Sequence, residues 1–264
     1  FGVKDSVDEF QKKKYSFIVE VFKAMERFSV RHADVVITPS DYFNRLVKGW
    51  FSGGGGESVN TDKRTNKVIT IYNGIDLNET FEKLPKYNEK TIISAGRLVP
   101  GKGFDLLIRI MKDMPEWKLH IVGEGPDEET LMRLAKDNSV ESRVLFLGKL
   151  PRLELFSEIY RSHVFALLSE SESFSFQIVE AMFVGTPVIA TRVGAIPELI
   201  ENGKDGILIN RADSVNFRDE AERLVNDSYY ATRISQNARL KVEHFSINNT
   251  VDQLYRICEN VVAK

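Results

Sequence analysis

Short apolar runs alternate with amphipathic stretches along most of this 264-residue chain. From residue 91 onward the apolar runs are four or five residues long, which suits buried strands, and stretches of helical periodicity separate them. Strands that are apolar on both faces and alternate with helices are typical of a doubly wound α/β domain with a parallel sheet. The runs that predict strands are Thr91–Ala95, Lys118–Val122, Val144–Leu147, Val164–Leu168, Pro187–Ala190 and Gly206–Ile209. The stretches that predict helices lie near residues 104–113, 127–137, 152–161, 176–184, 195–201, 214–226, 229–243 and 247–262.

The N-terminal part of the chain carries a separate set of signals. The predicted elements are a long amphipathic helix at 7–33, strands at 33–38 and 67–72, and a helix from Ser40 or Asp41 to Phe51. Gly53–Gly56 and the polar run to Asn66 predict a mobile loop, and a native loop is favoured over an engineered linker. Asn73–Asp76 reads Asn-Gly-Ile-Asp, which predicts a turn.

Composition narrows the classes of protein. The apolar fraction of 42% and the charged fraction of 28% are ordinary for a globular chain. The net charge of −2 offers no general attraction to nucleic acid, so any anion site must be local. The single cysteine, Cys258, excludes an intrachain disulfide framework and suits a reducing compartment, so we expect a cytoplasmic protein.

Membrane and targeting signals are weak in the sequence. No apolar run approaches the roughly 20 residues that a spanning helix needs. Phe1–Asp5 lacks the charged and apolar regions of a signal peptide. Peripheral association with the cytoplasmic face of a membrane stays open.

A glycine-rich turn with two cations follows the first predicted strand of the α/β region. It reads Gly-Arg-Leu-Val-Pro-Gly-Lys-Gly over residues 96–103 and opens a helix. Free N–H groups and the helix dipole favour the binding of a phosphate there. Arg97 can donate two hydrogen bonds to phosphate oxygens, and Lys102 adds a positive charge. A solvated turn with surface cations is the alternative. The turn matches neither a Walker P-loop nor Gly-x-Gly-x-x-Gly, so the hallmarks of P-loop ATPases and of dinucleotide binding are missing.

Two further turns end later strands. Residues 122–126, Val-Gly-Glu-Gly-Pro, form a glycine turn around Gly123 that a tight strand-to-helix connection needs whatever the function. Glu172 and Glu180 lie with seven residues between them, the first in a loop after a buried strand and the second in the first turns of a helix. Both can face one crevice at the carboxyl ends of the strands. Glutamates near a helix start are also common as solvated caps.

The helix that contains Glu180 offers a further place for an anion. The N–H groups of Phe174, Ser175 and Phe176 lie near its free donors.

Together, these motifs and the downstream Gly185–Glu198 resemble, in order and spacing, the donor half of family-4 retaining glycosyltransferases of the GT-B fold. The resemblance covers roughly residues 68–264. It implies an α/β, GT-B type doubly wound (Rossmann-like) donor domain with a truncated remnant of a second α/β domain. The implied organisation is a remnant of the N-terminal acceptor-binding domain at 1–72, an interdomain linker at 73–78, the nucleotide-sugar (donor) domain at 79–245 and a helix crossing back to the N-terminal domain at 246–264.

The resemblance also implies roles for individual residues. Arg97 and Lys102 would hold the donor phosphates, and Glu172 would bind the transferred sugar as the third member of the catalytic set. Lys149 and Leu150 would border the base, the backbone amides around Phe174, Ser175 and Phe176 would contact the diphosphate, and Glu180 would bind the ribose hydroxyls. Gly96, Gly123 and Ser173 complete the implied donor-binding residues. Ser173 and Ser175 stand where the family usually has glycine or proline, and the Cβ of each narrows the approach of sugar and phosphate.

The implied reaction moves a hexosyl group from a nucleoside-diphosphate sugar, a UDP- or GDP-sugar first of all, to an acceptor hydroxyl with retention. The acceptor would be a sugar or a lipid-linked molecule, and no cofactor is expected. Without an Asp-x-Asp signature or a His/Cys cluster, fixed cations rather than a metal would stabilise the departing diphosphate. A GT-B epimerase or phosphorylase is a further alternative, although the phosphorylases' pyridoxal-phosphate lysine motif is lacking.

Part of the acceptor half of the family pattern has no counterpart in this sequence. We expect roughly the first hundred residues of that domain to be missing, and with them the histidine that the family places near the reacting sugar, while His32 reads as a solvated or capping side chain. A second hypothesis is therefore a nucleotide-sugar-binding module that is inactive until missing residues or a partner supply the acceptor half.

Overall fold

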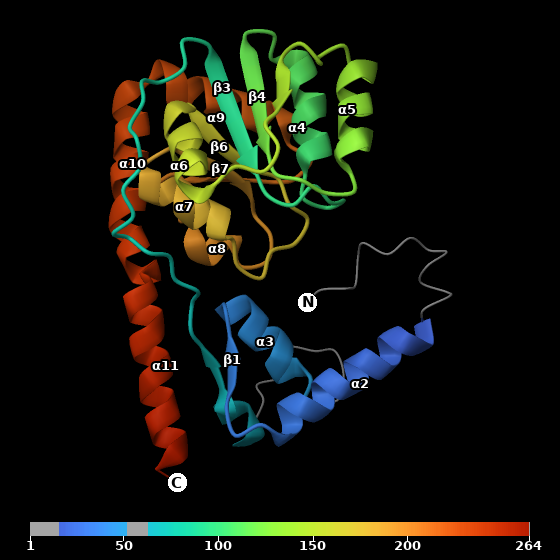
Figure 1. Ribbon diagram of the computed structural model, residues 1–264, viewed down its shortest axis with the longest axis vertical. Coiled ribbons are helices and arrows are strands. Elements are labelled where there is room, and N and C mark those ends of the chain that lie inside the picture. The colour runs from blue at the N-terminus through green and yellow to red at the C-terminus, as the bar shows by residue number, and fades with distance from the viewer. Residues whose placement is uncertain (1–15, 52–62, 264) are drawn as a thin grey trace. The chain divides into compact units, whose positions relative to one another are not determined.

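The computed structural model describes residues 16–51 and 63–263. The chain divides into two compact units, of which one comprises residues 1–72 with 252–264 and the other residues 73–251 (Figure 1). We describe each unit by itself.

The larger unit is built on a six-stranded sheet in the order β5-β4-β3-β6-β7-β8. All neighbouring strands in it run parallel. This order reverses direction between β3 and β6, which is the topological switch point where doubly wound sheets bind ligands. The predicted α/β fold class is confirmed. The strands are β3 (Lys90–Ala95), β4 (Trp117–Val122), β5 (Val144–Phe146), β6 (Val164–Leu167), β7 (Val188–Thr191) and β8 (Ile207–Ile209).

Each helix predicted from residue 104 onward is present, and the last of them, α11, continues from this unit into the smaller one at residue 252. The first is shorter than expected, because a 3₁₀ turn, η2 (Met111–Asp113), replaces its last residues. The predicted 195–201 helix is also reduced, to a single four-residue turn that has proline in its first turn. The helical elements are α4 (Phe104–Ile110), α5 (Glu128–Asp137), α6 (Arg152–Arg161), α7 (Phe176–Val184), α8 (Ile196–Leu199), α9 (Ser214–Asn226), α10 (Ser228–Val242), η3 (Glu243–Phe245) and α11 (Ile247–Val262).

The main core of this unit lies between the sheet and the helices α4, α5 and α9. Trp117 of β4, Leu107 of α4 and Phe217 of α9 are each no more than 1% exposed within it. Burying a large apolar side chain contributes about 1.5–3 kcal/mol. Aromatic rings fill another part of the unit, where Phe156 of α6 contacts Phe183 of α7 at 5.7 Å between ring centres. Apolar packing between their aromatic side chains therefore holds α6 and α7 together, and α7 contains the predicted site residue Glu180.

Within its described residues, the smaller unit contains a two-stranded parallel sheet, two α-helices and a 3₁₀ helix from its N-terminal segment, and the part of α11 from residue 252 onward. Ser40 caps the second helix by accepting a hydrogen bond from the N–H of Phe43 at 3.2 Å, which decides between the two candidates, Ser40 and Asp41. Val47, Phe51 and Val68 form a small buried cluster. The elements are α2 (Ser16–His32), β1 (Val36–Thr38), α3 (Asp41–Gly49), η1 (Lys63–Lys67) and β2 (Val68–Thr70).

Some predictions for this part of the chain need correction. The expected loop is wrong at residues 63–66, which form most of the 3₁₀ helix η1 because Thr65 is buried and fixes the chain there. The helix expected through Phe51 ends at Gly49, and the strand expected from Ala33 begins at Val36. Residues 7–15 of the predicted helix and 53–62 of the predicted loop lie outside the described residues.

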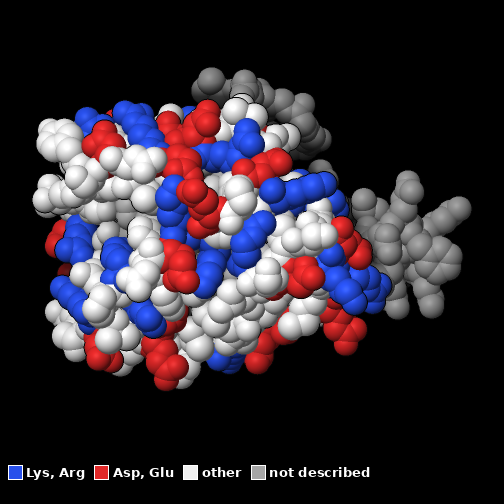
Figure 2. All heavy atoms as spheres, turned by 90° about the horizontal axis from the view of Figure 1, so that it is seen from above, with Lys and Arg blue, Asp and Glu red and all other residues white. Residues whose placement is uncertain are grey.

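Surface properties of the described residues add two findings. None of their helices is both long and apolar enough to cross a membrane. Positive and negative side chains lie interspersed over the face seen in Figure 2.

Candidate functional site

The loops after β3 and β4 are locked together by glycine. The N–H of Gly96 donates to the carbonyl of Val122 at 3.0 Å. Gly123 has φ +133°, and a Cβ added to it would lie 1.9 Å from the carbonyl oxygen of Gly96. Any side chain at Gly123 would therefore push these two strand ends apart. The need for glycine that the sequence analysis ascribed to a tight turn has this close backbone contact as its cause.

The loop over residues 96–103 is fastened on two sides. The N–H of Leu98 donates to the carbonyl of Glu124 at 3.0 Å, and Leu98 itself is fully buried. The carbonyl of Gly101 accepts from the N–H of Glu170 at 2.8 Å. This loop leaves Arg97 exposed and Lys102 partly buried. The two predicted phosphate-binding cations therefore stand on a backbone that the loops after β4 and β6 hold in place.

Lys102 and Glu172 lie in contact. The ammonium of Lys102 is 2.6 Å from Oε1 of Glu172, and the hydroxyl of Ser169 donates to the same oxygen at 2.8 Å. The Glu172 side chain is 8% exposed and that of Lys102 is 30% exposed. Burying a carboxylate without a cation and hydrogen bonds is costly, and Lys102 and Ser169 supply both. The structure thus brings the predicted phosphate-binding lysine and the predicted sugar-binding glutamate to one point, after β3 and β6.

The backbone around Glu172 is fixed by the segment that follows β7. The N–H of Ala195 donates to the carbonyl of Glu172 at 2.8 Å, and the Thr191 hydroxyl donates to the carbonyl of Ser169 at 2.7 Å. A Cβ on Gly194 would lie 2.1 Å from the Glu172 carbonyl oxygen. The glycine in the downstream motif is therefore needed for a second backbone to pack against this loop.

Ser175 starts α7. Its hydroxyl accepts a hydrogen bond from the N–H of Ile178 at 3.3 Å, which satisfies one of the free donors of the helix. Its φ of −125° is ordinary for any residue, so serine needs no strain where the family pattern has glycine or proline. On either side, Phe174 is 8% exposed and Phe176 is 42% exposed. Ser173, the other departure, is partly exposed.

Glu180 is held by an arginine that the sequence analysis missed. The carboxylate lies in α7 and is 4% exposed, and Nη1 of Arg152 in α6 contacts its Oε1. The Nε atom of Arg152 also binds Oε2 of Glu79 at 2.6 Å. Burial raises the pKa of Glu180, and Arg152 opposes that rise. The sequence signal for Arg152 was only its place two residues after Leu150, at the end of the predicted base-binding segment.

That base-binding segment lies after β5. Lys149 is exposed and Leu150 is partly buried. The N–H of Gly123 donates to the carbonyl of Gly148 at 2.8 Å, which ties this segment to the loop after β4. The predicted residues are therefore distributed over the loops after β3, β4, β5 and β6 and over α7. Lys102 and Glu172 form an ion pair between two of these residues, and the rings of Phe174 and Phe176 contact each other edge to face at 5.4 Å between ring centres.

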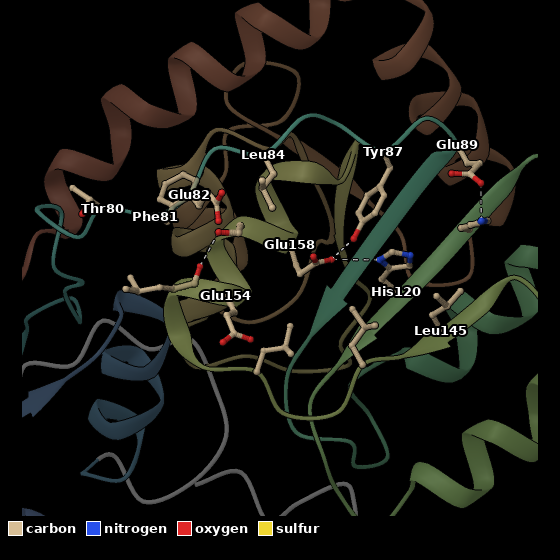
Figure 3. Close-up of a pocket in the computed structure, with 15 residues that line it drawn as sticks. Thr80, Phe81, Glu82, Leu84, Tyr87, Glu89, His120, Leu145, Glu154 and Glu158 are labelled. Atoms are coloured by element: carbon tan, nitrogen blue, oxygen red, sulfur yellow. Dashed lines mark hydrogen bonds and ion pairs between the residues drawn. The ribbon is translucent and has the colours of Figure 1, made fainter.

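A cavity of about 850 Å³ lies elsewhere on the larger unit (Figure 3). Its walls come from residues 80–89, β4, β5 and α6, and it shares only Leu150 with the predicted site. In Figure 3, Tyr87 and His120 both point toward Glu158, whose Oε2 accepts the Tyr87 hydroxyl and lies 3.8 Å from Nδ1 of His120. The cavity therefore borders the predicted base-binding segment at Leu150 but is lined by none of the other predicted site residues.

Glu158 is the central acid of that cavity. His120, followed by the Tyr87 hydroxyl and the Arg161 guanidinium, holds the pKa of Glu158 below its ordinary value, although burial acts in the other direction. Burial and the neighbouring carboxylate raise the pKa of Tyr87. These contacts join the segment before β3 to β4 and α6, which is a structural role. Within residues 16–51 and 63–263, no group of three or more His, Cys, Asp or Glu side chains is arranged to hold a metal.

Comparison with known proteins identifies the family to which this α/β chain belongs. A family model described as Glycosyl transferases group 1 matches residues 76–241, more than half of the chain. The chain belongs to this glycosyltransferase family. The match includes every predicted site residue, and also Glu79 and Arg152.

Individual relatives of this glycosyltransferase-family chain are longer. It is 33% identical over 250 residues to N-acetyl-alpha-D-glucosaminyl L-malate synthase of Bacillus anthracis, covering 89% of this chain and 62% of that protein. It is 30% identical over 195 residues to an uncharacterized glycosyltransferase of Haemophilus influenzae, covering 72% of this chain and 54% of that one. The chain thus spans between about half and two thirds of the length of these relatives.

Solved structures of the GT-B type share the fold of this group 1 chain. Sucrose-phosphate synthase from Thermosynechococcus elongatus superposes with a TM-score of 0.79 at 22% identity, over 92% of this chain and 62% of that one. Anabaena HepE in complex with UDP-glucose superposes with a TM-score of 0.73 at 24% identity, over 88% and 65% of the respective chains. At these identities the superpositions show the fold alone.

Proposed function

We propose that this chain is the donor-binding part of a retaining glycosyltransferase that moves a hexosyl group from a nucleoside-diphosphate sugar to an acceptor hydroxyl. The observation that carries the proposal is the contact between Lys102 and Glu172 at 2.6 Å. It joins the cationic loop after β3 to the acidic loop after β6, on the two sides of the switch point. A donor bound at that point would place its phosphate near the ammonium of Lys102 and its sugar hydroxyls near the carboxylate of Glu172.

The donor that fits this site is an anionic nucleotide with a sugar at its end. Arg97 and Lys102 would take the diphosphate, together with the free N–H groups at the start of α7. Glu172 would accept hydroxyls of the sugar, and Glu180 those of the ribose. A UDP- or GDP-sugar is the first choice, and the superposed HepE structure contains UDP-glucose.

The reaction follows from where charge develops. As the sugar–phosphate bond weakens, positive charge grows on the anomeric carbon and negative charge on the departing diphosphate. Groups arranged in advance for that departing charge lower the barrier, and Arg97 and Lys102 would supply fixed positive charge without a metal ion. The acceptor hydroxyl would attack from the face that the diphosphate leaves, with Glu172 orienting the sugar, so the configuration is retained.

The acceptor side of the proposal concerns the smaller unit. We propose that residues 1–72 form part of an acceptor-binding domain for a sugar or lipid-linked molecule, and that 73–78 link it to the donor domain. The last helix, within 246–264, would return to the acceptor side. Its residues from 252 onward group with the smaller unit.

The test of the donor site uses Arg97→Ala and Lys102→Ala with Arg109→Ala as matched control. Arg109 is another exposed arginine of the same region, in α4, outside the proposed site. Calorimetric titration with UDP- and GDP-sugars should show binding by the parent chain and the control, and binding weakened about tenfold or more by the two site variants. Unchanged affinity in both site variants would refute the phosphate assignment.

A second candidate function is a nucleotide-sugar-binding module that transfers nothing by itself. The chain's span of 54–62% of two related proteins favours it, since an acceptor half supplied by further residues or a partner would then complete the enzyme. Donor binding without hydrolysis or transfer by the isolated chain supports this candidate. Turnover by the isolated chain rejects it.

A further inference from the structure

Arg152 connects two acidic side chains from distant parts of the sequence. It is the first residue of α6, and its guanidinium contacts Oε1 of Glu180 in α7 through Nη1. Through Nε it binds Oε2 of Glu79, which precedes β3, at 2.6 Å. One guanidinium with donors in a fixed fork is suited to such a double contact. The three residues come from α6, α7 and the segment before the first strand of the larger unit.

The two carboxylates differ in how much they depend on Arg152. The side chain of Glu180 is 6% exposed, whereas that of Glu79 is 25% exposed and that of Arg152 is 40% exposed. A charged carboxylate buried to this degree is costly unless a cation and hydrogen bonds compensate it. Glu79 can reach water without the arginine, but Glu180 cannot. The contact therefore matters most for the state of Glu180.

We propose that Arg152 is a positioning residue of the donor site, which holds the buried Glu180 as an oriented anion able to accept hydrogen bonds from the donor's hydroxyls. This inference rests on the proposed function, in which Glu180 binds the ribose. Arg152 contacts Oε1 of Glu180, and no hydrogen bond to Oε2 is found within the described residues, so Oε2 keeps its full capacity to accept hydrogen bonds from a ligand. The role of Glu79 is to fix the other side of the guanidinium.

The charges around Glu180 set the direction of its pH response. Burial is the largest influence and raises the pKa of Glu180, Arg152 lowers it and Glu79 raises it. These are the charged groups from α6 and from the segment before β3 that act on Glu180 in the described part of the chain. Removing Arg152 leaves burial and the repulsion from Glu79 unopposed. The pKa of Glu180 then rises further, and the carboxylate loses its charge at a higher pH.

The experiment measures the dissociation constant of UDP and of GDP by calorimetry for the 264-residue chain, from about pH 5 to pH 8. The variants are Arg152→Ala, Arg152→Lys, Glu79→Gln and Glu180→Gln. Arg152→Ala should weaken nucleotide binding about tenfold at neutral pH and move the loss of affinity on acidification to higher pH. Arg152→Lys should recover part of both effects because it keeps the charge, and Glu79→Gln should change affinity by less than about threefold.

The outcomes show separately whether the positioning role of Arg152 fails and whether the proposed function fails. If Glu180→Gln binds nucleotide as the parent does, the ribose assignment of Glu180 fails. If Glu180→Gln binds weakly but Arg152→Ala keeps the parent's affinity and pH dependence, the positioning role fails while the proposed function stands. A loss of affinity in Arg152→Ala without any displacement of the pH profile also overturns positioning, because it indicates a structural contact only. Should Arg152→Ala not fold, as circular dichroism would show, Arg152→Lys decides by the same two readouts.

Discussion

The ammonium of Lys102 and the carboxylate of Glu172 form a pair 2.6 Å apart, although 69 residues separate them along the chain. A hydroxyl from Ser169 adds a second donor to the same carboxylate oxygen. Because the pair is mostly shielded from water, it links stability to the proposed donor site. Breaking it from either side should therefore have measurable thermodynamic consequences.

Removal of Lys102 should destabilise the larger unit. In Lys102→Ala the buried carboxylate of Glu172 keeps only the Ser169 hydroxyl, and we expect the free energy of unfolding in urea to fall by about 2–3 kcal/mol. Glu172→Gln should cost less, because the amide retains a bond to Ser169. The double variant Lys102→Ala with Glu172→Gln should be less destabilised than the sum of the single changes.

A matched exposed pair serves as control for that cycle. Lys118 and Glu89 are 2.8 Å apart, but their side chains are 37% and 54% exposed. Lys118→Ala should change the free energy of unfolding by no more than about 0.5–1 kcal/mol. Equal effects of Lys102→Ala and Lys118→Ala would contradict the importance of burial at the Lys102 pair.

The glycine contact between the loops after β3 and β4 gives a second prediction. Gly123→Ala combines a left-handed φ of +133° with a Cβ placed 1.9 Å from the Gly96 carbonyl oxygen. We expect it to lower the free energy of unfolding by more than about 4 kcal/mol, or to prevent folding. Gly148→Ala is the control, since its φ is +65° but nothing lies within 4 Å of the added Cβ. It should cost only about 1–2 kcal/mol in urea unfolding.

Ser175 offers a third prediction, on the departure from the family pattern. Ser175→Ala removes the cap of α7 and should lower the free energy of unfolding by about 1 kcal/mol, whereas Ser175→Gly should cost only a few tenths. If the Cβ of Ser175 narrows the approach of the donor, Ser175→Gly should also bind UDP- or GDP-sugar more tightly than the parent, and Ser175→Ala should not. Tighter binding by both variants would assign the effect to the hydroxyl instead.

A fourth prediction concerns pH and the cavity of Figure 3. The pKa of Glu158 is lowered from its usual 4.5 in the folded chain. The unfolded chain therefore binds more protons on acidification, so Glu158 contributes stability above about pH 4.5 that is lost as the pH falls through its folded pKa. Glu158→Gln should cost stability at pH 7, and this cost should shrink between about pH 5 and pH 3. Urea unfolding of the parent and of Glu158→Gln across that pH range tests this prediction. If the free energies of unfolding of the two proteins change in parallel with pH, the prediction is wrong.

The strands and helices were largely predictable because their signals are local. The apolar runs around Ile92, Ile121 and Ile189 mark central strands that are buried on both faces, and they needed no knowledge of their neighbours. The signal failed where a short segment depends on packing. Residues 63–66 read as a polar loop, yet they form most of η1 with Thr65 buried. The sequence pattern predicts that residues Met111–Asp113 continue the α-helix, yet they form a 3₁₀ turn.

For the candidate site, the sequence proposes residues but not the contacts between them. The order and spacing of Gly96–Gly103, Gly123 and the two glutamates were sufficient to select the family, and they predict the members of the candidate site. They could not show that Lys102 touches Glu172, because that pairing depends on β3 and β6 being neighbours in the sheet. They also gave no sign of Arg152, whose relation to Glu180 exists only through the packing of α6 against α7.

By itself, the sequence determined the α/β class, the succession of elements and the residues that carry charge at the strand ends, because periodicity, glycine and spacing are written along the chain. Only the tertiary structure decided the strand order β5-β4-β3-β6-β7-β8, and with it which loops share the switch point. It alone paired Lys102 with Glu172 and Arg152 with Glu180. The physical reason is that the burial and the charged partners of a side chain depend on its neighbours in space. Folding brings together residues that are far apart in the sequence and that no local pattern links.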